Sequence, residues 1–259
     1  MVKIESGGLR NKGILRGGGD KPFISIVIAV LNRVKCVGRA IESVARQTYD
    51  NVELVIVDGG STDGTVELLK KYDDVIDCWI SEPDHGIYDA LNKGVKLARG
   101  DWINIQGSDD FLFDSLDKMA LHLRSECTVY YGDLFYHYQK KIRFGKQTAY
   151  KLANHQFGHH RYFFPCKYFD IYSYNINLCI CADYEMVVRS YFDKNFAFEY
   201  VPIVVSEYNE LDGASFHLVD YEFERIRYQF LRSKFPIFYV IAFYLRKYIA
   251  EKRRRLTTK

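Results

Sequence analysis

Features that the sequence lacks exclude several classes of protein. The first 20 residues are polar and glycine-rich and contain no apolar stretch like that of a secretory signal. The main late apolar run, 235–245, has only about half of the roughly 20 residues that a helix needs to cross a bilayer. No internal repeat is visible. We therefore expect a cytoplasmic protein with no membrane span.

Other familiar signatures are also absent. The 6 cysteines lack the paired spacing of zinc fingers, so we expect reduced thiols. The net charge of +3 is too small to indicate binding to nucleic acid. The glycines of the 58–65 segment lack the Gly-x-Gly-x-x-Gly spacing of dinucleotide sites, and 31–33 lacks the glycine-rich basic loop of sugar nucleotidyltransferases. Binding to nucleic acid, binding of a dinucleotide and nucleotidyl transfer are therefore disfavoured.

The first half of the chain alternates between short apolar runs and amphipathic segments. Runs rich in β-branched residues predict buried strands, and the segments between them have helical spacing. The expected strands are 23–30, 52–57, 78–81 and 102–105, and the expected helices are 37–47, 65–72 and 87–98. This alternation predicts an α/β fold of three layers around a mostly parallel sheet.

The later chain has a different pattern and is rich in Tyr and Phe. We expect strands at 128–134, 139–144 and 201–208, then helices at 183–191 and 221–254. The predicted organisation is a flexible extension (1–20), one domain (21–215) and a basic, amphipathic helical tail (216–259). The domain would consist of a first half (21–111) and a second half (112–215).

Carboxylates follow two of the predicted strands. Asp58 comes after one strand, and Asp109 and Asp110 come shortly after another. Parallel sheets bind ligands at the carboxyl ends of their strands, so these side chains are expected to share one crevice. Adjacent carboxylates suit Mg²⁺ or Mn²⁺ bridging to a diphosphate. The alternatives are a turn aspartate at Asp58 and a solvated pair at Asp109 and Asp110.

Further polar segments are ambiguous when each is taken alone. Asn92 and Lys93 could line a sugar site or lie on the surface. Asp183 begins a predicted helix, where an aspartate serves either as an N-cap or as a general base, and Glu185 lies close by. His155-Gln156 and the nearby pair 159–160 favour a binding surface over zinc, although one histidine could complete a magnesium or manganese shell.

Taken in order, these segments resemble glycosyltransferase family 2, over residues 23–206. The resemblance rests on the motifs SIVIAVLN, SVARQTY, ELVIVDGGSTDGT and GIYDALNKG, at 25–32, 43–49, 53–65 and 86–94. It is most similar to the surface-polysaccharide transferases related to the colanic acid enzymes. Those carry a His-Gln pair and an Ala-Asp-Tyr-Glu segment, here His155-Gln156 and 182–185.

The resemblance implies a GT-A fold, which is Rossmann-like, and an inverting transfer from a UDP- or GDP-linked sugar. It implies Mg²⁺ or Mn²⁺ at Asp109 and Asp110 and a catalytic base at Asp183. Gly107 departs from the family, many of whose members have an aspartate there. The implied donor-binding residues are Ala29, Asn32, Asp58, Asn92, Lys93 and Ser108, and the acceptor-side candidates are His155, Gln156 and Glu185.

We therefore expect a glycosyltransferase that acts on a glycan or lipid-linked acceptor in the assembly of a bacterial surface polysaccharide. The alternative is a non-catalytic nucleotide-sugar-binding or scaffold subunit. This alternative is supported by Gly107, because the site then has one carboxylate fewer. The tail ends in Lys252 and three arginines. Such a tail either contacts the cytoplasmic face of the inner membrane peripherally or packs on the domain with its charges solvated.

Overall fold

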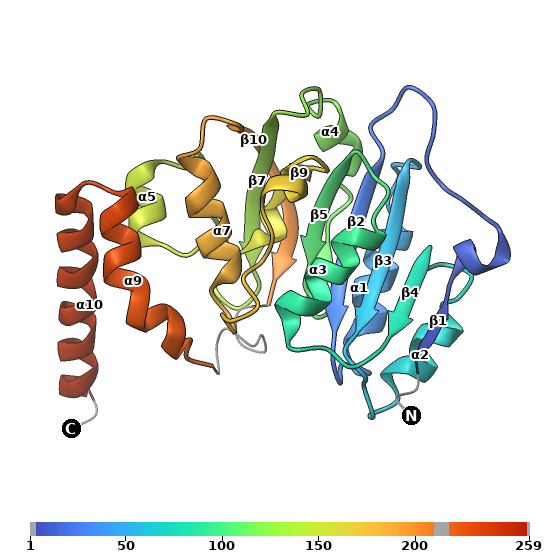
Figure 1. The fold of residues 1–259 in the computed structure, drawn as a ribbon, viewed down its shortest axis with the longest axis horizontal. Helices are drawn as coiled ribbons and strands as arrows, with labels where there is room; N and C mark the ends of the chain where they lie inside the picture. The colour runs from blue at the N-terminus through green and yellow to red at the C-terminus, as the bar shows by residue number, and fades with distance from the viewer. Residues whose placement is uncertain (1–3, 210–217, 258–259) are drawn as a thin grey trace.

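The computed structural model describes residues 4–209 and 218–257. A ten-stranded mixed sheet runs through the molecule, with the order β1-β4-β3-β2-β5-β9-β7-β10-β6 and β8 paired to β7 (Figure 1). The strands are β1 (Glu5–Gly7), β2 (Ile24–Val30), β3 (Val52–Asp58), β4 (Cys78–Ser81), β5 (Trp102–Gln106), β6 (Phe111–Leu112), β7 (Thr128–Tyr136), β8 (Lys141–Arg143), β9 (Tyr162–Pro165) and β10 (Ala197–Tyr208).

Helices cover both faces of this sheet. They are α1 (Val37–Ala45), α2 (Thr65–Lys71), α3 (Ile87–Leu97), α4 (Leu116–Ala120), α5 (Ala149–Asn154), α6 (Tyr168–Ile171), α7 (Ala182–Tyr191), α9 (Tyr221–Lys234) and α10 (Ile237–Thr257), with 3-10 turns η1 (Leu9–Lys12) and η2 (His159–Arg161). In the described residues, no helix is both long and apolar enough to cross a membrane.

The parallel half of the sheet confirms the predicted strand and helix alternation. Strands β4, β3, β2 and β5 are parallel neighbours. Alternate residues of β2 enter two separate cores. Ile24, Ile26 and Ile28 pack with α1 and α2, whereas Val27 packs with α3 on the other face. These runs lack exposed positions because helices cover both faces of a parallel sheet.

The second half of the sheet is mixed. Strand β9 pairs antiparallel with β5 and β7 and thereby joins the two halves. The long strand β10 runs parallel to β7, and β6 pairs antiparallel with β10. This arrangement places the turn after β5 beside η2 and the end of β10.

The N-terminal segment departs from the flexible extension that we expected for 1–20. Residues Glu5–Gly7 form strand β1, which pairs antiparallel with β4. Leu9 is buried, and Arg10 forms an ion pair of 2.6 Å with the buried Glu53. The prediction is wrong for residues 5–12, because pairing with a distant strand and one buried ion pair order a segment that has no apolar pattern of its own.

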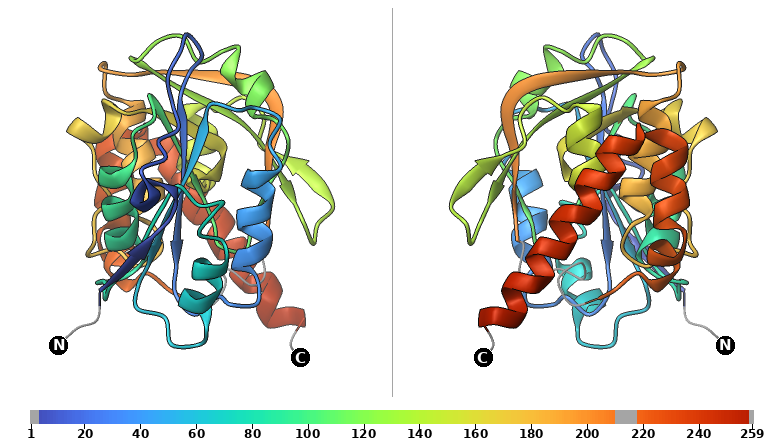
Figure 2. Two further views of the ribbon diagram at one scale, coloured as in Figure 1. Left: turned by 90° about the vertical axis from the view of Figure 1, so that its right-hand side faces the viewer. Right: turned by 90° about the vertical axis from the view of Figure 1, so that its left-hand side faces the viewer.

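The C-terminal region contains two helices where we predicted one over 221–254. Helix α9 ends at Lys234, and α10 begins at Ile237. Pro236 separates them, because proline has no backbone N–H and its ring clashes with a preceding helical turn. The two helices form a hairpin at the edge of the molecule (Figures 1 and 2).

Candidate active site

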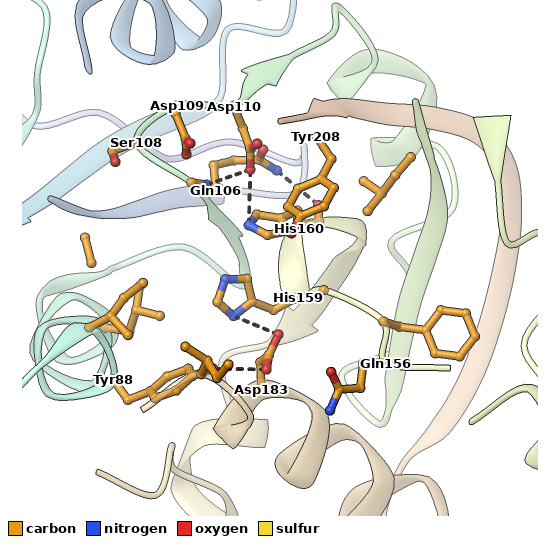
Figure 3. Close-up of a pocket in the computed structure, with 18 of the residues that line it drawn as sticks. Tyr88, Gln106, Ser108, Asp109, Asp110, Gln156, His159, His160, Asp183 and Tyr208 are labelled. Atoms are coloured by element: carbon orange, nitrogen blue, oxygen red, sulfur yellow. Dashed lines mark hydrogen bonds and ion pairs between the residues drawn. The ribbon is translucent and has the colours of Figure 1, made fainter. Parts of the chain in front are cut away.

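A cavity of about 390 Å³ opens where the parallel half of the sheet meets the second half (Figure 3). Its walls come from the end of β2, the start of α3, the turn after β5, the segment before η2 and the start of α7. The lining residues are Ala29, Arg33, Ile87, Tyr88, Leu91, 106–110, Leu134, Tyr136, 156–160, Cys179, Ile180, Asp183 and Tyr208.

The turn after β5 folds its last carboxylate back over the backbone. Asp110 accepts hydrogen bonds from the backbone N–H of Gly107 at 3.2 Å and of Asn209 at 3.0 Å. A Cβ at position 107 would lie 2.6 Å from Oδ2 of Asp110. The absence of a side chain at Gly107 therefore permits this tight turn.

Asp109 faces the cavity from the same turn. Its Oδ2 atom is buried and has no hydrogen-bond partner in the described residues. Burial, and secondly the charge of Asp110, raise the pKa of Asp109. Such an orphaned carboxylate oxygen is a natural ligand for a hard cation.

No group of three His, Cys, Asp or Glu side chains in the described residues could hold a metal ion by itself. Asp109, with Asp110 beside it, fits a cation that takes most of its oxygen ligands from water or from a bound diphosphate. Mg²⁺ is commonly held in this way, by one or two carboxylates plus substrate phosphates.

His160 links this turn to η2. Its Nε2 atom lies 3.1 Å from Oδ2 of Asp110, and its backbone carbonyl accepts hydrogen bonds from the side-chain amides of Asn104 and Gln106, at 3.1 and 3.0 Å. Burial raises the pKa of Asp110 to about 7 and lowers the pKa of His160 to about 4. The pair is therefore favoured in its neutral form, and a nearby cation would instead favour the carboxylate.

Asp183 occupies the opposite side of the cavity (Figure 3). Helix α7 begins at Ala182 with Cys181 as its N-cap, so Asp183 lies in the first turn and is not the cap residue. Its carboxylate accepts a hydrogen bond from the Tyr88 hydroxyl at 3.0 Å, and His159 Nδ1 lies 4.0 Å away. Burial raises the pKa of Asp183, which suits a group that takes up a proton.

The cavity brings together half of the site residues that the sequence predicted. They are Ala29, Ser108, Asp109, Asp110, Gln156 and Asp183. The other six do not line it, namely Asn32, Asp58, Asn92, Lys93, His155 and Glu185.

Asp58 and Asn32 are occupied within the loop that follows β3. The Asp58 carboxylate is buried and accepts hydrogen bonds from the N–H groups of Gly60 and Ser61, at 3.0 and 2.9 Å, and from the Ser81 hydroxyl at 2.7 Å. Asn32 has a positive φ of 53°, and its side-chain oxygen accepts from the Thr62 N–H at 2.9 Å. Both residues shape the loop beside the cavity.

The remaining four have other contacts. Asn92 exchanges two hydrogen bonds with the backbone of Tyr174, at 2.9 and 3.0 Å. Lys93 pairs with Glu82 at 2.8 Å. Glu185 lies 3.3 Å from Arg189, in a polar groove lined also by Asn92, and His155 is exposed.

Of the histidines in the predicted binding surface, His159 and His160 line the cavity together with Tyr88, whereas His155 does not. The pair at 159–160 was visible in the sequence, but nothing local shows that each ring approaches a different carboxylate. Tyr88 lies inside the GIYDALNKG motif, and this motif was the sequence feature that could have identified it as a site residue.

Comparisons with known proteins agree on the family. The family model described as "Glycosyl transferase family 2" matches residues 25–196. A "PGL/p-HBAD biosynthesis glycosyltransferase" of Mycobacterium tuberculosis is 32% identical over 214 residues, covering 78% of this chain and 82% of that protein. An uncharacterized glycosyltransferase of Haemophilus influenzae is 35% identical over 103 residues, covering 38% of this chain and 41% of that protein.

Solved structures share the fold. TarS of S. aureus in complex with UDP-GlcNAc has a TM-score of 0.67 at 15% identity, covering 80% of this chain and 65% of that chain. The mannosyltransferase PcManGT from Pyrobaculum calidifontis, in complex with GDP-Man and Mn²⁺, has a TM-score of 0.59 at 14% identity, covering 84% and 64%. This chain therefore spans just under two thirds of each. The predicted GT-A fold is confirmed.

Proposed function

The chain belongs to glycosyltransferase family 2, and from this premise we propose that it transfers a sugar from a nucleotide-diphosphate sugar to an acceptor hydroxyl with inversion. The observation that carries the proposal is the pair of carboxylates on opposite sides of one cavity. Asp109 offers a buried oxygen that has no hydrogen-bond partner among the described residues on one side, and Asp183 lies on the other (Figure 3).

The donor diphosphate would lie against the turn that contains Ser108 and Asp109. Asp109, supported by Asp110, would hold Mg²⁺ or Mn²⁺ there. When bound, this cation offsets the charge that develops on the departing diphosphate. Arg33 also lines the cavity, and its charge acts on Asp109, so it would add positive charge near the phosphates. The neighbouring structures that contain UDP-GlcNAc, or GDP-Man and Mn²⁺, support a donor of this class.

Asp183 would act as the general base. The carboxylate takes the proton from the acceptor hydroxyl as the oxygen attacks the anomeric carbon, and the bond to the diphosphate breaks in the same step. Because the base and the diphosphate would stand on opposite sides of the sugar, attack comes from the face opposite the leaving group. A single displacement of this kind inverts the anomeric configuration.

Two neighbours would position the base. Tyr88 donates its hydrogen bond to Asp183 and fixes the orientation of the carboxylate. His159 is buried, and burial holds its pKa well below the ordinary value, so a neutral imidazole faces Asp183. A neutral neighbour leaves the carboxylate free to accept the proton of the substrate.

The acceptor would enter from the second half of the domain. That wall combines apolar side chains with hydroxyl and amide groups, among them Tyr136, Gln156, Phe157, Ile180 and Tyr208. Such a surface fits a glycan or a lipid-linked sugar. A role in bacterial surface-polysaccharide assembly and a cytoplasmic location stay predictions.

The test is transfer itself. The purified chain is incubated with UDP- and GDP-sugars, Mn²⁺ and a panel of glycan and lipid-linked acceptors. Release of nucleoside diphosphate and the anomeric configuration of the product are followed by NMR. We expect one donor to give a product of inverted configuration. Donor binding without transfer to any acceptor would favour the non-catalytic subunit, and a product of retained configuration would contradict the role of Asp183.

A further inference from the structure

The hairpin of α9 and α10 packs on the body of the domain through contacts with α7 and α5. Phe223 of α9 is fully buried and packs edge-on against Tyr184 of α7, with ring centroids 5.8 Å apart. Tyr239 of α10 packs against Tyr150 of α5 at 5.2 Å, and Arg246 donates to the Tyr150 hydroxyl at 2.9 Å. These contacts fix which face of α10 points inward.

The opposite face of α10 is apolar and exposed. Ile237, Ile241, Leu245 and Tyr248 are spaced by four, four and three residues, so they form one stripe along the helix. Each is between 42% and 57% exposed. Phe238 and Ile249 widen the stripe.

A shallow apolar groove extends this face toward α9. It is lined by Tyr228, Ile237, Val240, Ile241, Tyr244 and Leu245. Figure 1 shows α10 at the outer edge of the molecule, on the side away from the sheet. An exposed apolar surface of this kind on a folded domain indicates a binding site.

Charge is distributed very unevenly between this hairpin and the rest of the chain. Residues 221–259 contain 11 Lys or Arg and 3 Asp or Glu, a formal charge of +8. The remaining 220 residues carry −5, since the whole chain is +3. Lys252 continues the apolar stripe, with its ammonium 4.9 Å from the centre of the Tyr248 ring.

We propose that the exposed face of α10 binds the surface of a membrane that contains anionic lipid, with the helix lying in the plane of that surface. The apolar stripe would enter the boundary between headgroups and acyl chains, and basic residues beside it, such as Lys252, would contact the lipid phosphates. A second copy of the chain is a poorer partner for this face, because it would bring two segments of +8 together. This binding requires neither donor nor acceptor, so it stands apart from the proposed reaction.

The experiment is vesicle flotation of the full chain without nucleotide sugar. Phosphatidylcholine vesicles with and without phosphatidylglycerol are compared, at low and at high salt. We expect binding only to the anionic vesicles, and weaker binding at high salt because counterions screen the attraction. The double variant I241E/L245E should reduce the partition coefficient by about tenfold or more, since it removes two apolar side chains from the stripe.

The matched control is L121E/I142E. Both positions are apolar and at least 60% exposed. Leu121 directly follows α4 and Ile142 lies on β8, so both are away from the hairpin. Circular dichroism verifies that each variant is folded. If I241E/L245E does not fold, Lys252→Glu replaces it, and a reduced partition coefficient is expected again.

Any of three results would contradict the proposal. Flotation of I241E/L245E equal to that of the wild type would show that this face does not contact lipid. Failure of the wild type to float, together with a dimer in sedimentation velocity that I241E/L245E dissociates, would show that the face is an interface between copies. Equal binding to vesicles with and without phosphatidylglycerol would contradict the role of the charges.

Discussion

Tyr88, in the first turn of α3, donates a hydrogen bond of 3.0 Å to Asp183, in the first turn of α7, across a separation of 95 residues. The contact joins the two halves of the domain at the cavity. It also acts on the chemistry of Asp183, because burial raises the pKa of this carboxyl whereas the Tyr88 hydrogen bond lowers it. The backbone N–H of Tyr184 lowers the pKa of Asp183 as well, so Tyr88 is one of the groups that oppose the effect of burial.

The Asp183→Asn variant should separate binding from chemistry. An amide has nearly the shape of the carboxylate but cannot take up the proton of an acceptor hydroxyl. We expect kcat to fall by about 10³-fold and the donor Kd to stay near the wild-type value. Glu185→Gln is the matched control on the same helix, and it should retain activity because Glu185 does not line the cavity. Normal turnover by Asp183→Asn would mean that another group is the base.

The Tyr88→Phe variant should change the pH dependence of the reaction. Activity requires ionised Asp183, so kcat/KM should be lost as the pH falls through the pKa of that carboxyl. This pKa lies above the ordinary value for aspartate. Loss of the Tyr88 hydrogen bond raises it further, and the acidic limb of the profile should move to higher pH. Tyr221→Phe, at an exposed position, should leave the limb unchanged.

The Gly107→Ala variant should disturb the turn that carries Asp109 and Asp110. The added Cβ would lie 2.6 Å from Oδ2 of Asp110, so that buried carboxylate would have to move. We expect a loss of about 1–3 kcal/mol in the free energy of unfolding, measured in urea, and weaker donor binding. Gly38→Ala in α1, whose Cβ would approach no atom closer than 3.4 Å, is the control. An unchanged stability for Gly107→Ala would contradict this explanation of the glycine.

The His160→Ala variant should weaken donor binding in the presence of Mn²⁺. His160 contacts Asp110, so its loss should act through the position of the carboxylates. Removal of such supporting contacts typically costs about tenfold or more in metal affinity. His155→Ala, at an exposed position, should bind as the wild type does. Donor binding is measured by calorimetry. If His155→Ala weakened it more than His160→Ala does, His155 would be favoured as the site residue.

Much of the parallel half was predictable from the sequence because each buried strand is a continuous apolar run. Strand β4 matches its prediction, and β2 and β5 differ from theirs by one residue at one end. Strand β1 was missed because Glu5–Gly7 has no apolar pattern and is a strand only through pairing with β4. Strand β9 was missed because its four residues follow an irregular segment rich in aromatic and histidine side chains.

The candidate site was predictable to a smaller extent. Asp109 and Asp58 were both predicted because each follows a buried strand. In the structure, however, the Asp58 carboxylate accepts hydrogen bonds from N–H and hydroxyl groups of the chain around it. The approach of His159 to Asp183 depends on how η2 and α7 are packed, which no local pattern encodes. Helical spacing likewise predicted an amphipathic tail, whereas the direction of its apolar face follows from the contacts of Tyr239 and Arg246 with Tyr150.

The most direct test of the account is a calorimetric titration with UDP, GDP and their common sugar conjugates, first with Mn²⁺ and then with EDTA. It is performed on the wild type and on Asp109→Asn. We predict that one nucleotide class binds the wild type, that EDTA weakens this binding strongly, and that Asp109→Asn weakens it to a similar degree. Binding that neither EDTA nor the substitution changes, or no binding of any nucleotide sugar, would contradict it.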